Sequence, residues 1–377
     1  MSTVKVNAIT DGSGGNTATI NSMTPTADSL QGFRNRLING SMVIDQRNAG
    51  ASYTQTGAAG QYSLDRWNVS GDITSKFSVQ QNAGSVTPPT GFTNYLGATS
   101  LSAYSVPVSE AYIIRQQIEG FNVADLAWGT ASAKTVTLSF WVRSSLTGTF
   151  GGVLKNSGNN RSYPFTYTIS AANTWEQETV TIAGDTSGTW LTNNGIGLMV
   201  IFSLGSGSSV SGTAGAWAAS SLFSATGAVS VVGTNGATFY ITGVQLEVGS
   251  VATPFERRDY GRELMLCQRY YYRNTAPSGS QYGSGYNDST ANAFFNIPFP
   301  VTMRTSPTAL EQSGTAGNYA IQRSGDFPTC TSVPVFDSAN TQSAFVRFTS
   351  TGNLTAGQGS SARSANSAGY LGWSAEL

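Results

Sequence analysis

Histidine is absent from all 377 residues of the chain. Histidine is the general base of Ser-His-Asp and Cys-His triads and a common ligand of catalytic zinc. Its absence excludes these classes of enzyme. The G-x-x-x-x-G-K-[ST] phosphate-binding loop is also missing, and the Gly/Ser-rich stretch 205–212 lacks the lysine that such a loop needs.

Charge is the second scarcity. Asp, Glu, Lys and Arg make up 11% of the chain, under half of the usual share of about 25%. The 20 basic residues balance the 20 acidic ones, so the net charge is zero. No overall field then attracts nucleic acid or an anionic membrane, and neither partner is predicted. We expect solubility to depend on hydroxyl, amide and backbone groups, or on a surface covered by partners.

Cysteine and long apolar runs are scarce as well. The two cysteines, Cys267 and Cys330, are too few for a disulfide framework and are predicted to be small buried apolar side chains. No apolar run reaches the roughly 18 residues that would span a bilayer. The opening residues, MSTVKVNAIT, do not resemble a secretory signal. We therefore expect synthesis in a cytosol and no membrane insertion.

What the chain does contain is a series of β-favouring runs separated by Gly, Ser, Asn and Pro. In residues 136–142, four apolar side chains alternate with three others, as in a strand with one buried face. Comparable runs recur at 111–118, 134–145, 163–169, 175–184, 196–205 and 237–249. This spacing predicts an all-β fold built on a two-sheet antiparallel jelly-roll β-sandwich. Residues 121–129 are expected to form a short helical or irregular crossing.

Changes in composition along the chain divide it into four parts. Residues 1–32 contain no aromatic residue and are predicted to form an extended N-terminal arm. Residues 33–252 are assigned to the jelly roll, 253–273 to a connector helix, and 274–377 to a second, smaller C-terminal β-sandwich domain. The first strand of this last domain is expected at a sheet edge because prolines bracket it, namely Pro298, Pro300 and Pro307.

The connector, ATPFERRDYGRELMLCQRYYYR (252–273), is where charge gathers, with five arginines and three acidic residues. Two helix starts compete: a capping box at Thr253–Glu256, or a later start with Asp259 as the N-cap. The later start is preferred, because Gly261 would cost about 1 kcal/mol inside the longer helix. The three consecutive tyrosines after the helix favour a return to strand.

One helical face of the connector is predicted to be apolar. Tyr260, Leu264, Cys267 and Tyr271 follow a spacing of i, i+4, i+7 and i+11, and the first three are expected to be buried. This face could pack on the flanking domains of its own chain. Alternatively, it could meet other copies around a threefold axis, with arginines pairing with carboxylates of neighbouring subunits: Arg257, Arg258, Arg262 and Arg269.

Several short motifs in residues 33–273 resemble a recurrent module of bacteriophage tail-fibre and related virion proteins, especially those of phages that infect marine bacteria. The motifs are Asn39-Gly40, Asp65-Arg66-Trp67, Gln245-Leu246-Glu247, Pro254-Phe255-Glu256 and Leu266-Cys267-Gln268-Arg269-Tyr270. The resemblance implies a jelly roll like that of carbohydrate-binding modules, in a homotrimer. It also implies that residues 1–32 attach to other phage tail or capsid proteins and that a distal end faces the host.

The chain departs from the resemblance at one point. Many carbohydrate-binding jelly rolls carry an aspartate just before the valine of the last strand, where it binds a structural calcium. Here Thr242-Gly243 occupies these positions, and Glu247 remains as an oxygen ligand. A calcium ion usually needs six to eight oxygens. No metal and no other cofactor is therefore predicted.

Two tryptophans are candidates for stacking on sugar rings. Trp128 and Trp217 lie in Gly/Ala/Ser-rich segments that resemble loops, where an indole could be exposed. The alternative is that both plug the ends of the sandwich core. Trp67 follows a charged pair at a strand start and is predicted to be in the core.

Catalysis by carboxylates alone stays open, because glycoside hydrolysis needs two of them roughly 5–10 Å apart. Asp65 with Arg66 could be half of such a pair, but a buried ion pair at the sandwich edge is preferred. Nothing in the spacing selects a pair among the other candidates, which are Glu110, Glu119, Asp125, Glu176, Glu178 and Asp185. We therefore predict no catalytic residues.

The sequence thus predicts a structural virion protein, made in the host cytoplasm and located in the virion. It would be a tail fibre or related appendage that contributes to host attachment by binding a cell-surface glycan or protein receptor. The alternatives are a capsid-attached fibre or decoration protein, a carbohydrate-binding module without a trimer, and a depolymerase of surface polysaccharide.

Overall fold

The computed structural model describes residues 33–377, so the predicted arm at 1–32 lies outside the described residues. The chain divides into two compact units. Of the described residues, the N-terminal unit contains 33–43, Ser52–Gln61 and Trp67–Arg257, and the C-terminal unit contains Ile44–Ala51, Tyr62–Arg66 and Arg258–Leu377. Two short segments from early in the sequence therefore belong to the C-terminal unit, whereas the sequence analysis assigned both to residues 33–252 of the jelly roll.

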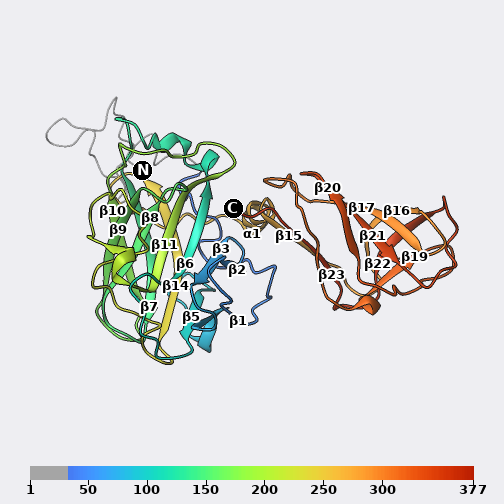
Figure 1. The fold of residues 1–377 in the computed structure, drawn as a ribbon, viewed down its shortest axis with the longest axis horizontal. Coiled ribbons are helices and arrows are strands. Elements are labelled where there is room, and N and C mark those ends of the chain that lie inside the picture. Colours follow the sequence, from blue (N-terminus) through green and yellow to red (C-terminus); the bar gives the residue numbers. More distant parts are fainter. Residues whose placement is uncertain (1–32) are drawn as a thin grey trace, which may run out of the picture. The chain divides into compact units, whose positions relative to one another are not determined.

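Two six-stranded sheets form the N-terminal unit, except that residues 62–64 at the end of one strand are assigned to the C-terminal unit (Figure 1). The first has the order β1 (Tyr53–Thr54), β4 (Phe77–Gln81), β5 (Leu96–Ser100), β14 (Thr238–Val248), β7 (Val136–Ser144) and β10 (Glu176–Ile182). The second has the order β2 (Gln61–Leu64), β3 (Trp67–Gly71), β6 (Ala111–Glu119), β11 (Ile196–Ser206), β8 (Gly148–Lys155) and β9 (Ser162–Ile169). The central pairings, β14 with β7 and β11 with β6, are antiparallel. The predicted all-β jelly-roll sandwich is confirmed.

Short elements join these strands. They are η1 (Ala83–Ser85), η2 (Gly120–Asn122), η3 (Ala124–Leu126), η4 (Ser208–Val210), and the parallel two-stranded pair β12 (Ser211–Gly212) and β13 (Ser224–Ala225). The crossing expected at 121–129 is thus η2 and η3. Within residues 33–377, no helix is both long and apolar enough to cross a membrane.

The core lies between the two sheets of the N-terminal unit. The four alternating apolar residues of β7, such as Phe140, are fully buried. The Phe140 ring meets that of Phe202 on β11 edge-on, with centroids 5.0 Å apart, which joins the sheets. The sequence did not predict β8, because glycines interrupt its β-favouring pattern. Gly152 is needed there, since a Cβ would come within 2.3 Å of the Phe165 ring.

The C-terminal unit contains two sheets and one α-helix. A three-stranded sheet has the order β15 (Tyr271–Thr275), β23 (Tyr370–Ser374) and β18 (Glu311–Gln312). A six-stranded sheet has the order β19 (Tyr319–Gln322), β22 (Gly359–Ser364), β16 (Gln281–Asn287), β17 (Asn292–Pro298), β21 (Ser343–Thr349) and β20 (Val335–Ala339). The helices are α1 (Tyr260–Gln268) and η5 (Ala316–Asn318). Its apolar core includes Phe295, Val346 and Trp373.

The predicted edge position of the proline-bracketed strand is wrong, because β17 lies between β16 and β21. The strand tolerates Pro298 because its pairing with β16 has already ended at Asn296. The missing N–H of Pro298 therefore removes no bond from that side of the ladder.

The connector helix begins where Asp259 caps it: the Asp259 side chain accepts a hydrogen bond from the backbone N–H of Arg262. This confirms the later of the two predicted starts, and β15 confirms the return to strand. The predicted buried face is partly wrong, however. Cys267 is fully buried and Leu264 is half-buried, but Tyr260 is 64% exposed.

Glu263 takes the inward position that was expected for Tyr260. It is buried and forms an ion pair with Arg258 at 3.3 Å, which offsets the cost of desolvating the carboxylate. The inward face of α1 is therefore Glu263 and Cys267, followed by Tyr270. Cys267 and Cys330 are free and buried, as predicted.

Candidate functional site

Three tryptophans gather at one end of the N-terminal unit. Trp128 follows η3, Trp190 lies in the loop between β10 and β11, and Trp217 lies between β12 and β13. Their ring centroids are 4.8 Å apart for Trp128–Trp190, 5.3 Å for Trp128–Trp217 and 5.4 Å for Trp190–Trp217. All three contacts are edge-to-face, a favourable arrangement for aromatic rings.

Backbone carbonyls satisfy the polar atom of each indole. The Nε1–H of Trp128 donates to the Lys134 carbonyl at 2.8 Å, that of Trp190 to Ser187 at 3.1 Å, and that of Trp217 to Ala183 at 2.8 Å. These bonds fix the orientation of the rings. They also use the only donor of each side chain, so a ligand can meet these indoles through their carbon surfaces.

An ion pair holds the loop that carries Trp190. Arg161 donates to both carboxylate oxygens of Asp185 at 2.6 Å, and Asp185 is 1% exposed. The Asp185 carbonyl also accepts from the backbone N–H of Gly129 at 2.7 Å. Gly129 has a positive φ of 85°, and a Cβ there would come within 2.6 Å of the Gly188 carbonyl. The segments carrying Trp128 and Trp190 are thereby fixed to each other.

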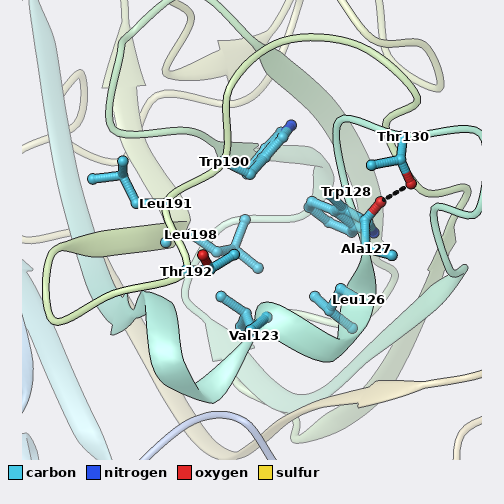
Figure 2. Close-up of a pocket in the computed structure, with 11 residues that line it drawn as sticks. Val123, Leu126, Ala127, Trp128, Thr130, Trp190, Leu191, Thr192 and Leu198 are labelled. Atoms are coloured by element: carbon cyan, nitrogen blue, oxygen red, sulfur yellow. Dashed lines mark hydrogen bonds between the residues drawn. The ribbon is translucent and has the colours of Figure 1, made fainter.

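A pocket of about 220 Å³ lies beside this cluster (Figure 2). Its apolar lining includes Val123, Leu126 and Leu198, with Trp128 and Trp190 as aromatic walls. The remaining lining residues are Ala124, Ala127, Thr130, Leu191, Thr192 and Gly197. None of the lining residues is charged, so the pocket suits an uncharged group with an apolar surface.

Two hydroxyl groups lie among the lining residues. The Thr130 hydroxyl donates to the Ala127 carbonyl at 2.6 Å (Figure 2). The exposed Thr192 side chain makes no hydrogen bond with any residue that the structure describes. Thr192 therefore offers a ligand a donor and an acceptor.

The two predicted sugar-stacking residues have different places in this site. Trp128 lines the pocket and is 8% exposed, so most of its ring packs in the protein. Trp217 is half-buried and does not line the pocket; it supports the other two indoles and packs edge-on against Tyr163 at 5.2 Å. Trp190 was not predicted from the sequence, although its segment, SGTWLTNNG, has the loop-like composition that selected the other two tryptophans.

The motifs that carry the resemblance form a buried polar network in the N-terminal unit. The Gln245 amide donates to Glu247 at 2.8 Å and accepts from the backbone N–H of Glu256 at 2.7 Å. Glu247 accepts from the backbone and hydroxyl of Thr253, and the Glu256 carboxylate accepts from the backbone N–H of Asn35 at 2.7 Å. This network fixes the chain that enters and leaves β14.

Asn39-Gly40 and Trp67 form a second structural device. The Asn39 carbonyl accepts from the buried indole of Trp67 at 2.9 Å, and the predicted core position of Trp67 is confirmed. Gly40 approaches β14 so closely that a Cβ would lie 2.2 Å from the Val244 carbonyl. These motif residues therefore have structural roles: Trp67 packs in the core, and Gly40 lets its backbone lie close to β14.

Asp65 and Arg66 were predicted to form an ion pair at the edge of the jelly-roll sandwich. In the structure both residues belong to the C-terminal unit instead. Arg66 forms an ion pair with Glu376 and lies over the Tyr270 ring, 3.6 Å from its centroid. Asp65 accepts hydrogen bonds from Gln46. Burial raises the pKa of Asp65 from 3.8 to about 6, against the opposing effect of the Gln46 hydrogen bonds.

The remaining arginines of the connector lie in varied environments. Arg257 lies over the Phe92 ring at 4.8 Å, and Arg269 donates to the Thr302 carbonyl at 3.5 Å. Arg262 is exposed. Tyr271, the fourth residue of the predicted apolar face, is 1% exposed beneath Arg47. Their predicted role at an interface between copies of the chain stays a prediction.

Most of the carboxylates considered for catalysis take part in local hydrogen bonds or ion pairs; Glu178 makes neither with any described residue, and burial raises its pKa. Glu110 accepts from the hydroxyls of Tyr104 and Tyr112, and Asp125 forms an ion pair with Arg36 at 2.7 Å. Glu176 accepts from the backbone at Ser170 and Ala171. In the part of the chain from 33 to 377, no group of three or more Cys, Asp or Glu side chains could hold a metal ion.

No family model and no curated protein matches this chain. Among solved structures, the chain is similar to the enzymatically active domain of bacteriophage CBA120 tailspike protein 4, with 13% identity and a TM-score of 0.31. That match covers 58% of this chain and 22% of the tailspike chain.

Two carbohydrate-binding modules are similar to this chain with comparably low identity and TM-score. One is TmCBM61 in complex with beta-1,4-galactotriose, with 12% identity and a TM-score of 0.29, covering 57% of this chain and 99% of that chain. The other is a family 11 module from Clostridium thermocellum, with 11% identity and a TM-score of 0.27, covering 55% and 100%. Likenesses this distant carry no argument about function, and the fold class rests on the sheets described above.

Proposed function

We propose that the pocket beside Trp190 binds a neutral sugar unit of a cell-surface glycan. The observation that carries the proposal is an uncharged pocket with two indole walls and the unengaged hydroxyl of Thr192. Sugar rings present an apolar C–H surface and polar hydroxyls, which match aromatic walls and a few polar groups. The volume of about 220 Å³ is below the roughly 300–1,000 Å³ of pockets for drug-sized ligands, so the site suits a single ring.

The wider role in this proposal is that of a virion appendage, a tail fibre or a related fibre. The support is the sequence resemblance, whose motifs form the buried network around β14. In this role the chain is a binding and structural protein rather than an enzyme. It assembles as a homotrimer, and residues 1–32 attach to other tail or capsid proteins.

Glycan binding is tested with the full chain on an array of surface glycans. We expect a neutral glycan to bind, and Trp190→Ala to weaken this binding on the order of tenfold or more because it removes one aromatic wall. Thr192→Val keeps the shape of the side chain and is expected to weaken binding by a few-fold through loss of the hydroxyl.

Trp175→Ala is the matched control. Trp175 is also half-buried and also donates its indole N–H to a backbone carbonyl, that of Thr87, but it does not line the pocket. Binding that Trp190→Ala and Trp175→Ala weaken equally would contradict the assignment to this pocket. Absence of binding to every neutral glycan would remove the proposal.

The virion role has its own test. Light scattering with multi-angle detection is expected to give the mass of three chains, and a monomer at high concentration would count heavily against a fibre. Electron microscopy of the parent particle, labelled against residues 274–377, would distinguish attachment to the tail from attachment to the capsid.

A further inference from the structure

The six-stranded sheet of the C-terminal unit has one face buried in the core and an outer face whose side chains on β17 are half-buried or exposed. Along β17, Ala293, Phe295 and Ile297 are buried in the core. Phe294 and Asn296 alternate with them and point to the opposite face, as the two-residue period of a strand requires. The strands β16, β17 and β21, which are neighbours in this sheet, carry further aromatic residues on this outer face.

Three aromatic rings stack across these strands. Tyr286 lies directly opposite Phe294 in the register, and their centroids are 6.1 Å apart. Phe345 lies 5.6 Å from Phe294, and the two ring planes differ by only 10°. Tyr286 is 45% exposed, and the two phenylalanines are half-buried. The rings form a continuous apolar surface over three strands.

Polar side chains with no hydrogen-bond or ion-pair partner among residues 33–377 border this aromatic stack. Arg347 is exposed and lies directly opposite Phe294 in the β17–β21 register. The Arg347 side chain makes no hydrogen bond and no ion pair with any residue from 33 to 377, and the side chains of Asn296 and Ser284 make no hydrogen bond within the same range. The groups that could bind the polar edge of a ligand are thus unengaged.

Arginine is the main charged residue of this face. The neighbouring edge strand β20 carries one exposed carboxylate, Asp337, which forms no ion pair with Arg347. The outward positions of β16, β17, β21 and β22 carry Arg347 and Arg363 and no carboxylate. Arg363 packs over the ring of Phe327, 4.0 Å from its centroid, and Phe327 is 48% exposed. In a chain with zero net charge, two arginines beside exposed aromatic rings are a local attraction for an anion.

We propose that this face binds an acidic polysaccharide. The sugar rings lie on Tyr286, Phe294 and Phe345, and a ring carboxylate accepts hydrogen bonds from the planar fork of Arg347. A neutral glycan would leave Arg347 without a counter-charge. A second copy of the chain in a twofold contact would bring the arginines of the two copies together. The site is distinct from the pocket beside Trp190, so either can fail alone.

The test is calorimetric titration of the full chain with matched pairs of oligosaccharides of equal linkage and length. Each pair has an acidic and a neutral member: mannuronate and mannose, glucuronate and glucose, galacturonate and galactose. We expect at least one acidic member to bind about tenfold or more tightly than its neutral partner, because the carboxylate adds charge-assisted hydrogen bonds. Binding is also expected to weaken as salt is raised.

Two variants test the named residues, and three serve as controls. Arg347→Gln and Phe294→Ala are each expected to weaken binding of the acidic member on the order of tenfold. Arg262→Gln and Tyr260→Ala change an exposed arginine and an exposed tyrosine elsewhere in the same unit and should leave binding unchanged. Trp190→Ala should also leave it unchanged, which separates this site from the pocket of the N-terminal unit.

Three results would overturn the proposal. The first is that none of the acidic members binds, and the second is that the neutral members bind equally well. The third is that Arg347→Gln has no effect. If Phe294→Ala instead abolishes self-association measured by light scattering, and acidic sugars do not bind, the face is a contact between copies of the chain.

Discussion

Aromatic side chains cluster in both units, yet the two clusters are built in opposite ways. At the end of the N-terminal unit, three indoles meet edge to face, and their N–H groups bind backbone carbonyls. In the C-terminal unit, tyrosine rings are covered by guanidinium groups: Arg47 lies 3.5 Å above Tyr271, Arg66 covers Tyr270, and Arg273 lies 3.4 Å above Tyr370.

The difference determines what each cluster can do. Guanidinium groups occupy the faces of the tyrosines, and Glu376 in turn pairs with Arg66 and Arg47, so this cluster is closed by its own charges. Among residues 33–377 no charged side chain lies over these indoles, and two of them, Trp128 and Trp190, line an uncharged pocket instead. Similar rings therefore serve as internal cross-links in one unit and as walls of a pocket in the other.

The largest expected effect comes from removing the shared carboxylate of the closed cluster. Glu376→Ala should lower the free energy of unfolding of the C-terminal unit by roughly 3–5 kcal/mol, because the buried Arg66 and the half-buried Arg47 lose the carboxylate they share and only Arg47 keeps a second one, Glu311. Urea unfolding followed by circular dichroism measures the loss. Asp337→Ala removes an exposed carboxylate of the same unit and is the control; equal midpoints for both variants would refute the cross-linking role.

In the cluster of three tryptophans, Trp128 should contribute more to stability and Trp190 more to sugar binding. Trp128→Ala is expected to cost roughly 3–5 kcal/mol of unfolding free energy because Trp128 is buried. Trp190→Ala should cost less, because Trp190 is half-buried, while it weakens sugar binding most. Calorimetric unfolding gives the stabilities. A Trp190→Ala variant less stable than Trp128→Ala would reverse the proposed division of roles.

The closed cluster should also respond to pH through Asp65. Its pKa rises from 3.8 to about 6 on folding because the carboxyl is buried. The folded state therefore holds the proton more tightly, and the C-terminal unit loses up to about 3 kcal/mol as pH rises through this window. Asp65→Asn removes this dependence. As pH is raised from 3.8 to about 6, the free energy of unfolding of Asp65→Asn should increase relative to that of the natural chain. A difference that stays constant over this range would contradict the assignment.

The smallest effect is expected at the residue whose burial was mispredicted. Tyr260→Ala should change the unfolding free energy by no more than about 0.5 kcal/mol, because the side chain is exposed. Leu264→Ala, on the half-buried side of the same helix, should cost more. If the tyrosine substitution is the costlier of the two, Tyr260 must be covered in solution by a partner, as the predicted interface between copies would require.

Much of the fold could be predicted because it follows from local pattern. The alternation in 136–142 identified β7, and the residues around Asp259 identified the start of α1. The predictions that were wrong depend on neighbours distant in the sequence. Pro298 lies in a central strand because its partner strand ends earlier, and Tyr260 faces solvent because the pairing of Glu263 with Arg258 lets that glutamate take the inward side.

The candidate sites also combine residues that local pattern identified with residues that only distant contacts bring together. The sequence offered Trp128 and Trp217, but the missed Trp190 reaches them through the ion pair of Arg161 with Asp185, residues that are 24 positions apart. The aromatic stack of the C-terminal unit depends on the order and register of β16, β17 and β21. Register cannot be read from single strands, because a shift of one residue would move every side chain to the other face.

The sequence by itself determined an all-β chain of low charge without histidine, and it marked the one charged stretch as a junction between two β units. Local alternation and capping are enough for these conclusions, because they act over a few residues. Only the tertiary structure decided that Arg66, taken with Asp65 for an ion pair at the sandwich edge, meets Glu376 across 310 positions of sequence. Such pairs arise when folding brings distant segments together, and burial then makes their charges specific partners.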